Sequence, residues 1–335
     1  MEKTFYLETG STDPAYNLAF EEYVLTHRRE GSYLILWQNE NAVIVGRNQN
    51  AEAEINRSFV EEHGIRVIRR NSGGGTVYHD LGNLNYSFIT DVTAPDQQSA
   101  AAFTAPVVCA LQALGLHAEC SGRNDILVAG RKVSGTAQQH LHGRILHHGT
   151  LLFDTDPAMI AGALNPDPEK FRSKGVASVR SRVGSIRAAL PADMTIDQFW
   201  AHLKKNLSTS GIQPCFLTEQ ELEAVLTLKQ EKYDTWEWNF GRSPQYQSCF
   251  RHRWPGGTLE VHLSVTRGKI SDADILGDFL GREPVDMLTQ LLIGCPYREE
   301  YLRSCLQGFP LEACLGGITL QQLLATILNK SKEPG

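Results

Sequence analysis

The sequence predicts an α+β protein in which a mixed β-sheet with helices is followed by a small α+β domain. Two observations lead to this fold class. Short runs of β-branched and aromatic residues joined by tight turns dominate residues 33–153, whereas helical periodicity comes in separate blocks instead of following each strand. A polar segment at residues 237–244 (EWNFGRSP) precedes a second group of strands and helices. We therefore expect one domain over residues 1–243 and another over residues 246–335.

The first helix is predicted to begin at Asp13 and Pro14, an N-cap acceptor followed by a residue whose φ suits the first helical turn. Apolar residues at helical spacing then continue through residues 15–27. The apolar runs at residues 33–37 (YLILW) and 42–47 (AVIVGR) are separated by four polar residues and predict a β-hairpin. Further strands are predicted at residues 65–70, 76–80 and 83–90, and a further helix at residues 99–114.

Two more hairpins are predicted, with turns at Ala129-Gly130 and at His142-Gly143. Helical patterns resume at residues 195–207 and 219–233. The C-terminal region predicts three antiparallel strands within residues 250–276. Three helices are expected after them, at residues 284–294, 299–308 and 319–329.

Composition excludes several classes of protein. A chain of 335 residues can bury a substantial core without disulfides or metals. The net charge of -6 argues against a protein that coats nucleic acid or anionic membrane. Seven scattered cysteines, never in a CxxC pair, indicate reduced thiols. The N-terminal segment lacks a signal or transit pattern, and no apolar run approaches the roughly 20 residues that cross a bilayer. We expect a cytoplasmic protein.

The segment RRNSGGGTVYHDLGNLNYSF (residues 69–88) contains three consecutive glycines. Such a run reaches left-handed backbone conformations and lets another molecule approach the main chain, and its successive N–H groups can form a concave anion site. Arg69 and Arg70 could add bidentate bonds to a phosphate or carboxylate. The segment matches neither GxGxxG nor GxxxxGK[ST], so a flexible turn and a ligand-binding loop both stay open.

A second polar stretch is GRNDILVAGRKVSGTAQ (residues 122–138), where Lys132 lies between Gly130 and Gly135. A lysine on a rigid strand beside small residues can direct its ammonium at a fixed point, although an exposed lysine after a hairpin is the commoner case.

The next stretch, HHGTLLF (residues 147–153), begins with two histidines that point to opposite faces of a strand and so cannot readily share a metal. We expect no protein metal site, even with His140 and His142 nearby, and one histidine lining a pocket. Cys109 and Cys120 have no local signature of a nucleophile and are expected to be structural.

Taken in order with KGVASVRSRVGSI (residues 174–186), these motifs resemble the lipoate-protein ligase A family of the biotin/lipoyl protein ligase superfamily. The likeness spans nearly the whole chain, and the C-terminal region looks like the family's small accessory domain. The resemblance implies a catalytic domain of the biotin/lipoyl ligase fold, related to class II aminoacyl-tRNA synthetases. It also implies an enzyme that joins lipoate to ATP, forms lipoyl-AMP and passes the lipoyl group to a lysine of a lipoyl domain.

The resemblance also implies the site residues. Lys132 is expected to be the catalytic lysine, contacting both the acyl carboxyl and the phosphate. The residues expected to bind ATP or lipoyl-AMP are Arg70, Ser72, Gly73, Gly74, Gly75, Thr76, Val77, Tyr78, His79, Asn124, Asp125 and Lys132. The lipoyl pocket is expected to comprise Trp37, Val45, Gly46, Gly74, Val77, Lys132 and His148. Mg²⁺ would be held mainly by the ATP phosphates, with Asp125 or Asn124 orienting it.

The implied partners are lipoyl domains of 2-oxoacid dehydrogenase subunits or the glycine-cleavage H protein, and we expect a monomer. Two alternatives within the same fold remain open: a transferase that takes preformed lipoyl-AMP, and a cysteine octanoyltransferase. The latter needs a thiolate in the pocket, and no cysteine lies in any of the motifs. A non-catalytic lipoate-binding protein is the alternative from another class. The sequence does not distinguish lipoate from octanoate.

Overall fold

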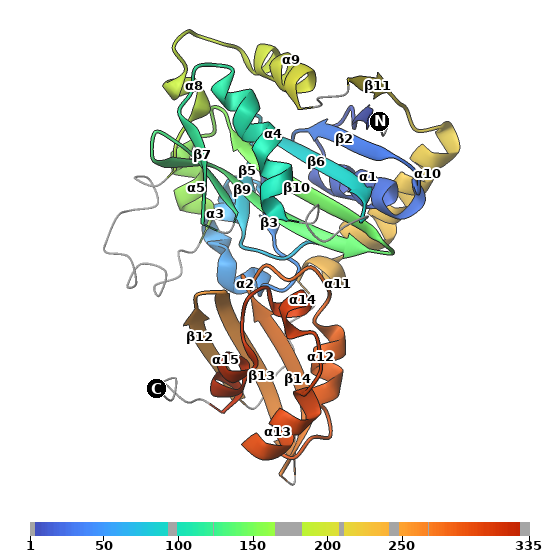
Figure 1. The fold of residues 1–335 in the computed structure, drawn as a ribbon, viewed down its shortest axis with the longest axis vertical. Helices are drawn as coiled ribbons and strands as arrows, with labels where there is room; N and C mark the ends of the chain where they lie inside the picture. The colour runs from blue at the N-terminus through green and yellow to red at the C-terminus, as the bar shows by residue number, and fades with distance from the viewer. Residues whose placement is uncertain are drawn as a thin grey trace.

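The computed structural model describes residues 4–92, 99–122, 124–164, 183–207, 211–240, 248–266 and 268–328. Its larger, N-terminal part is built on a mixed eight-stranded sheet with the order β11-β1-β2-β6-β10-β9-β8-β7 (Figure 1). The strands are β1 (Thr4–Glu8), β2 (Ser32–Trp37), β6 (Asn83–Asp91), β7 (Ala118–Ser121), β8 (Asp125–Val128), β9 (Arg131–Leu141), β10 (Arg144–Leu152) and β11 (Ile212–Pro214). β1 runs parallel to β2 and β11, and the other pairs are antiparallel.

Both faces of this sheet are covered, which explains why β2 is apolar at nearly every position. Leu34 and Leu36 pack on the side of α4 (Ala100–Gln112) and α9 (Ile196–Asn206), whereas Tyr33, Ile35 and Trp37 pack on the side of α1 (Pro14–His27) and α10 (Glu219–Leu228). The helices of this part are α1 (Pro14–His27), α2 (Ala51–Glu54), α3 (Arg57–Glu62), α4 (Ala100–Gln112), α5 (Pro157–Ala163), α8 (Ile186–Ala189), α9 (Ile196–Asn206), α10 (Glu219–Leu228), the π-helical η2 (Lys229–Tyr233) and α11 (Trp236–Asn239). As predicted, Asp13 caps α1 by accepting hydrogen bonds from the amides of Ala15 and Tyr16.

The predicted hairpin between residues 33–37 and 42–47 is wrong. β3 (Ala42–Val45) belongs to a separate three-stranded sheet, in which it pairs with β4 (Arg66–Arg69) in parallel and with β5 (Val77–His79) antiparallel. The intervening polar residues bond to α1 instead of closing a turn, since the Asn17 Nδ2 donates to the Gln38 carbonyl and to the Asn39 Oδ1. These bonds help to direct the chain from one sheet to the other.

The hairpins predicted further along are confirmed. Ala129 and His142, the first residues of the two turns, both have positive φ, as do the glycines that follow them. The predicted helices at residues 99–114, 195–207 and 219–233 correspond to α4, α9 and α10 with η2.

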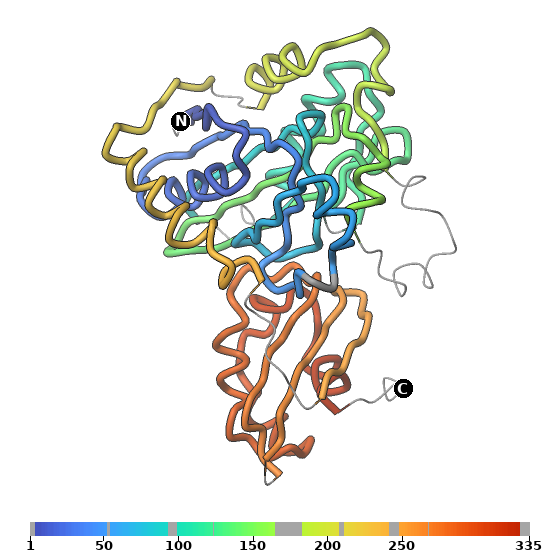
Figure 2. The backbone as a smooth tube through the Cα atoms, turned by 180° about the vertical axis from the view of Figure 1, so that it is seen from behind, coloured from blue at the N-terminus to red at the C-terminus, as the bar shows by residue number. Residues whose placement is uncertain are grey.

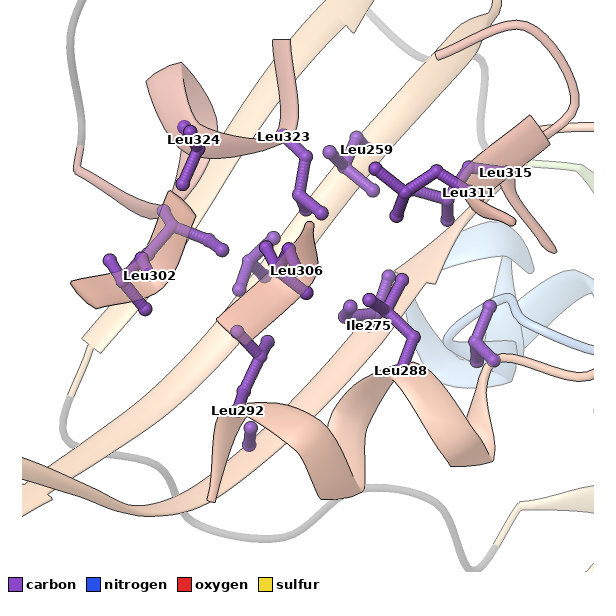
Figure 3. Close-up of a cluster of buried hydrophobic side chains, with 14 of the residues drawn as sticks. Leu259, Ile275, Leu288, Leu292, Leu302, Leu306, Leu311, Leu315, Leu323 and Leu324 are labelled. Atoms are coloured by element: carbon purple, nitrogen blue, oxygen red, sulfur yellow. The ribbon is translucent and has the colours of Figure 1, made fainter. Parts of the chain in front are cut away.

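The C-terminal part is an antiparallel sheet of three strands with helices packed on one face. Its elements are β12 (Ser248–Trp254), β13 (Gly257–Thr266), β14 (Lys269–Gly277), α12 (Asp286–Leu292), α13 (Glu299–Leu306), α14 (Leu311–Leu315) and α15 (Leu320–Ile327). Leucines from all four helices meet Leu259 and Ile275 of the sheet to form its core (Figure 3). The three strands and three of these helices are as predicted, whereas the five-residue α14 is too short to give a periodic signal.

The two parts meet at the glycine-rich segment, and α2 and α11 also lie at the junction (Figures 1 and 2). Backbone hydrogen bonds join Gly74 N to Phe279 O at 3.2 Å, Gly277 N to Asn48 O at 2.6 Å and His140 N to Arg282 O at 3.1 Å. The predicted connector is partly helical, because α11 includes its first residues, and residues 241–247 lie outside the described chain. None of the helices in the described ranges combines the length and apolar character needed to cross a bilayer.

Candidate active site

A cavity of about 810 Å³ lies where the glycine-rich segment, the β8–β9 hairpin and the C-terminal part meet. Most of the predicted site residues line it: Trp37, Arg70, Gly74, Gly75, Thr76, Val77, His79, Asn124, Asp125, Lys132 and His148. The other predicted residues, Val45, Gly46, Ser72, Gly73 and Tyr78, are not in its wall. Residues 174–182 of the fourth motif lie outside the described chain.

The five residues outside the cavity wall pack against neighbouring segments or, in the case of Ser72, join a hydrogen-bond network. Val45 faces away, into a cluster with Val43 and Tyr78, because neighbouring residues of a strand point to opposite faces. Its neighbour Ile44 lines the cavity in its place. Gly46 lies against Gly74, since a Cβ there would overlap the Gly74 carbonyl. The hydroxyl of Tyr78 donates to Asn41 at 3.0 Å.

Arg70 organises the glycine-rich segment from within. Its Nη2 donates to the carbonyls of Gly73 (2.6 Å) and Gly75 (2.8 Å), its Nη1 donates to the Ile44 carbonyl, and its Nε donates to the Ser72 hydroxyl. These bonds use most of its donors. Burial lowers the pKa of Arg70 to about 10, so the guanidinium remains charged at neutral pH. The arginine holds the loop that forms part of the cavity wall.

Arg69, which could bind a ligand on the sequence evidence, is absent from the cavity wall. Only 1% of it is exposed, and it donates to five main-chain carbonyls. The acceptors are Gly46, Arg47, Gln49, Trp238 and Asn239. A fork of donors in this position joins the end of β3 to α11 by hydrogen bonds to main-chain carbonyls of both segments.

The three glycines differ in what lies against them. A Cβ on Gly73 would come within 2.9 Å of the Phe279 carbonyl oxygen, and one on Gly74 within 3.1 Å of the Leu280 Cδ2. Gly74 also has a positive φ of 88° and donates its N–H to Phe279. Gly75 has open space around its Cβ position and lines the cavity. Two of the glycines therefore accommodate the C-terminal part, and the third leaves the main chain open to a ligand.

Lys132 owes its direction to a β-bulge in β9. The register between β8 and β9 shifts next to it, so that Leu127 pairs with Lys132 and Ile126 with Ser134. The extra residue, Val133, brings Lys132 and Gly135 to the same face of the strand, where the lysine side chain lies over the glycine. The Nζ of Lys132 is 2.7 Å from the Oδ1 of Asp125. The ammonium is thus held at the cavity wall.

The end of the cavity near α1 is largely apolar. Trp37 and Val77 line it as predicted, together with Leu18 and Ile44, which were not predicted. The indole Nε1 of Trp37 is satisfied by the Ser87 hydroxyl at 2.9 Å, so the ring is fixed in place. An apolar slot of this kind suits a hydrocarbon tail.

A buried polar network supports this end. Glu21 on α1 accepts from the Ser87 hydroxyl and contacts the Nδ1 of His148 at 2.9 Å, and the Nε2 of His148 is 2.7 Å from the Ser72 hydroxyl. Ser72 in turn accepts from Arg70. The network links α1 and β10 to the glycine-rich segment, and Glu21 had no recognisable signal in the sequence.

The histidines of β10 have the side-chain directions that the sequence predicts. His147 and His148 point to opposite faces, and His147 stacks on Phe103 with a centroid distance of 5.0 Å. Burial lowers the pKa of His79, which lines the cavity, to about 3, with further lowering from Arg70 and His148. The His79 ring is therefore neutral.

Among the described residues, Cys249, Glu260 and His262 form the one cluster with metal-ligand spacing. These three residues do not line the cavity.

The family models identify the chain. The model of the lipoyl protein ligase A/B catalytic domain matches residues 13–208, and that of the bacterial lipoate protein ligase C-terminus matches residues 243–327. Lipoate-protein ligase LplJ of Bacillus subtilis is 44% identical over 94% of this chain and 97% of its own. The chain belongs to the lipoate-protein ligase family. Lipoate–protein ligase 1 of Staphylococcus aureus is 39% identical to this ligase over 96% of the chain and 98% of its own.

Solved structures resemble this ligase as well. LipL1 of P. falciparum, in complex with lipoate, superposes with a TM-score of 0.77 over 91% of this chain and 94% of its own, and at 23% identity it supports the fold alone. A bi-partite lipoate protein ligase of Thermoplasma acidophilum, described with its E2 lipoyl domain, is 30% identical with a TM-score of 0.62 over 74% of this chain and 99% of its own. A lipoate-protein ligase A bound with ATP is 30% identical to this chain. It superposes with a TM-score of 0.61 over 72% of this chain and 99% of its own. The predicted α+β ligase fold is confirmed.

Proposed function

We propose that this ligase uses ATP to convert lipoate to lipoyl-AMP and then transfers the lipoyl group to a lysine of an acceptor protein. The observation that carries the proposal is the cavity itself. It combines a fixed ammonium, an open glycine backbone and an apolar slot, which suit a carboxylate, a phosphate chain and a hydrocarbon tail. The names of the relatives and the bound ATP and lipoate of similar structures support the same reaction.

In the first step a lipoate carboxylate oxygen bonds to the α-phosphorus of ATP, and the bond from that phosphorus to the pyrophosphate breaks. Two anions must approach each other, so fixed cations and backbone donors at the reacting atoms lower the barrier. Lys132 would neutralise both groups, with Asp125 and Gly135 fixing its position. Gly75 and Thr76 would contact the nucleotide, while Trp37, Ile44 and Val77 would hold the tail.

In the second step the neutral amine of the acceptor lysine attacks the acyl carbonyl carbon of lipoyl-AMP. An amide bond forms, the bond from carbonyl to phosphate oxygen breaks, AMP leaves, and the attacking nitrogen loses a proton. No nucleophilic side chain of the ligase is needed, because the mixed anhydride is already activated.

The cavity also suits Mg²⁺ bound through ATP. Among the described residues that line the cavity, the carboxylates are Asp125 and Asp278, and Asn124, which precedes Asp125 in the chain, lines it too. Mg²⁺ takes oxygen ligands and usually keeps several waters, so one or two protein oxygens suffice. Asp125 and Asn124 would hold the ion, which would supply charge neutralisation at the phosphates.

The acceptor would be a lipoyl domain of a 2-oxoacid dehydrogenase subunit or the glycine-cleavage H protein. The description of the Thermoplasma acidophilum ligase with its E2 lipoyl domain supports this class of partner. We take residues 1–243 as the catalytic domain and residues 246–335 as the accessory domain, and expect a monomer.

The second candidate is a transferase that uses a preactivated acyl donor. None of the described residues that line the cavity is a cysteine, which disfavours its thiol-dependent form. A pyrophosphate-release assay with lipoate and ATP, and without acceptor, separates the candidates. The ligase should release pyrophosphate only when lipoate is present. Lipoylation of an acceptor from synthetic lipoyl-AMP, without any lipoate-dependent release from ATP, would establish the transferase instead.

A further inference from the structure

The C-terminal part contributes a second cation to the cavity. Arg253, on β12, lines it together with Asp278 and Leu280. It therefore shares the cavity with Lys132, although the two residues belong to different sheets. Neither the sequence motifs nor the ligase chemistry described above gives Arg253 a role.

Hydrogen bonds fix one end of the Arg253 guanidinium. Its Nη1 lies 2.9 Å and 2.7 Å from the two carboxylate oxygens of Asp278 and 2.6 Å from the Thr258 hydroxyl. Asp278 is itself held, because its Oδ1 accepts from the Thr258 amide. Its side chain is only 9% exposed, compared with 30% for that of Arg253. The guanidinium is thus anchored at Nη1 on a buried carboxylate.

The other donors of this guanidinium remain available. Within the described ranges, no protein atom accepts a hydrogen bond from the Nε or Nη2 of Arg253. These two nitrogens form the edge that binds two oxygens of a phosphate side by side. Arg70 differs, because its donors are mostly used by the carbonyls of the glycine-rich segment.

We propose that Arg253 binds the β- and γ-phosphates of ATP through its Nε and Nη2, and that Asp278 positions it. This inference rests on the proposed function. A triphosphate carries more negative charge than Lys132 can neutralise alone, and Arg253 supplies a cation from the opposite part of the molecule. Lipoyl-AMP keeps only the α-phosphate, so Arg253 acts in adenylate formation and not in lipoyl transfer. The C-terminal part is thereby coupled to the first step of the reaction.

The test compares Arg253→Ala with Arg251→Ala in the full-length protein. Arg251 lies two positions earlier on the same strand, pairs with Glu260 at 3.4 Å and does not line the cavity. Calorimetry measures binding of a non-hydrolysable ATP analogue and of AMP to each variant. Loss of a bidentate charged contact should weaken binding of the analogue on the order of 10- to 100-fold in Arg253→Ala, with AMP binding unchanged. Arg251→Ala should bind both like the wild type.

A second variant guards against misfolding, because Arg253→Ala leaves Asp278 without its cation. Arg253→Gln combined with Asp278→Asn keeps polar side chains at both positions and leaves no buried unpaired charge. It should show the same selective loss of ATP-analogue binding, and it should transfer the lipoyl group from synthetic lipoyl-AMP at the wild-type rate.

Two results would overturn the inference: analogue binding by Arg253→Ala equal to that of Arg251→Ala, or an equal loss of AMP and analogue binding in both Arg253 variants. Failure of the proposed function is distinguishable, because in that case the wild type itself would show no lipoate-dependent pyrophosphate release.

Discussion

The side chain of Lys132 lies across Gly135, so that a Cβ at position 135 would come within 3.2 Å of the lysine Nζ and 3.3 Å of its Cε. The bulge between them puts both residues on one face of β9, and Asp125 on the neighbouring strand completes the arrangement. The position of the ammonium therefore depends on the absence of a side chain three residues away.

Substitution of Gly135 should impair catalysis more than folding. Gly135→Val should move the ammonium off the cavity wall while the extended backbone of β9 accepts a β-branched residue. We expect lipoyl-AMP formation to fall roughly 10- to 100-fold, as electrostatic groups depend on placement. Initial rates of pyrophosphate release and thermal midpoints check this. Gly143→Asn, in the β9–β10 turn where no atom lies near the Cβ position, is the matched control and should retain full activity.

Loss of Arg69 should destabilise the fold. Its five bonds to buried carbonyls would be left unmade in Arg69→Met, at a cost of about 3–5 kcal/mol of unfolding free energy. Denaturant unfolding measures the change. Arg57→Ala removes an exposed pair with Glu61 and should change stability by less than about 1 kcal/mol. Normal stability of Arg69→Met together with weakened ATP binding would restore the ligand role for Arg69.

His147 should make stability sensitive to mild acid. Burial lowers its pKa from 6.5 to about 3, and neither ring nitrogen has a partner within the described residues. As the pH falls from 6.5 towards 3, the unfolded chain takes up a proton that the folded chain does not. Stability should therefore decrease by about 1.4 kcal/mol per pH unit from this residue.

The change His147→Leu should remove that contribution. Chemical denaturation at pH 7.5 and at pH 5 should show a smaller loss of stability on acidification than in the wild type. The exposed His117 provides the control, since His117→Leu should leave the acid sensitivity in place. An unchanged difference between the two pH values in His147→Leu would contradict the assignment.

Local patterns predicted most of the elements, but not how they pair. The runs around β2 and β3 look alike in the sequence because each is buried, and nothing in them reveals that they belong to different sheets. Strand pairing depends on residues distant in the chain, such as Asn17 of α1, which fixes the segment between the two strands. The hairpins at Ala129-Gly130 and His142-Gly143 succeeded because their turn residues are local.

The site residues that lie in local motifs were likewise predictable, whereas contacts between distant parts of the chain were not. Lys132, Gly75 and Asp125 were predicted because each lies in a recognisable motif, and they line one cavity. The sequence predicts Val45 in the cavity wall, whereas the structure places Ile44 there, because the pattern of a short strand that is apolar throughout does not assign its faces. Arg70 lines the cavity as predicted, whereas Arg69 is absent from its wall and donates to main-chain carbonyls that only the folded structure brings near it. Arg253 and Asp278 line the cavity from the C-terminal part, for which the sequence predicted an accessory domain but no site residue.

We expect Lys132 to act on the carboxylate and the phosphate that join to form lipoyl-AMP. The most direct test of this role is mass-spectrometric detection of lipoyl-AMP made from lipoate and ATP, without acceptor, by the wild type and by Lys132→Ala, with thermal midpoints measured in parallel. The wild type should form the adenylate, and Lys132→Ala should form it at least roughly 100-fold more slowly with an unchanged midpoint. Adenylate formation by folded Lys132→Ala at the wild-type rate would exclude this role for Lys132.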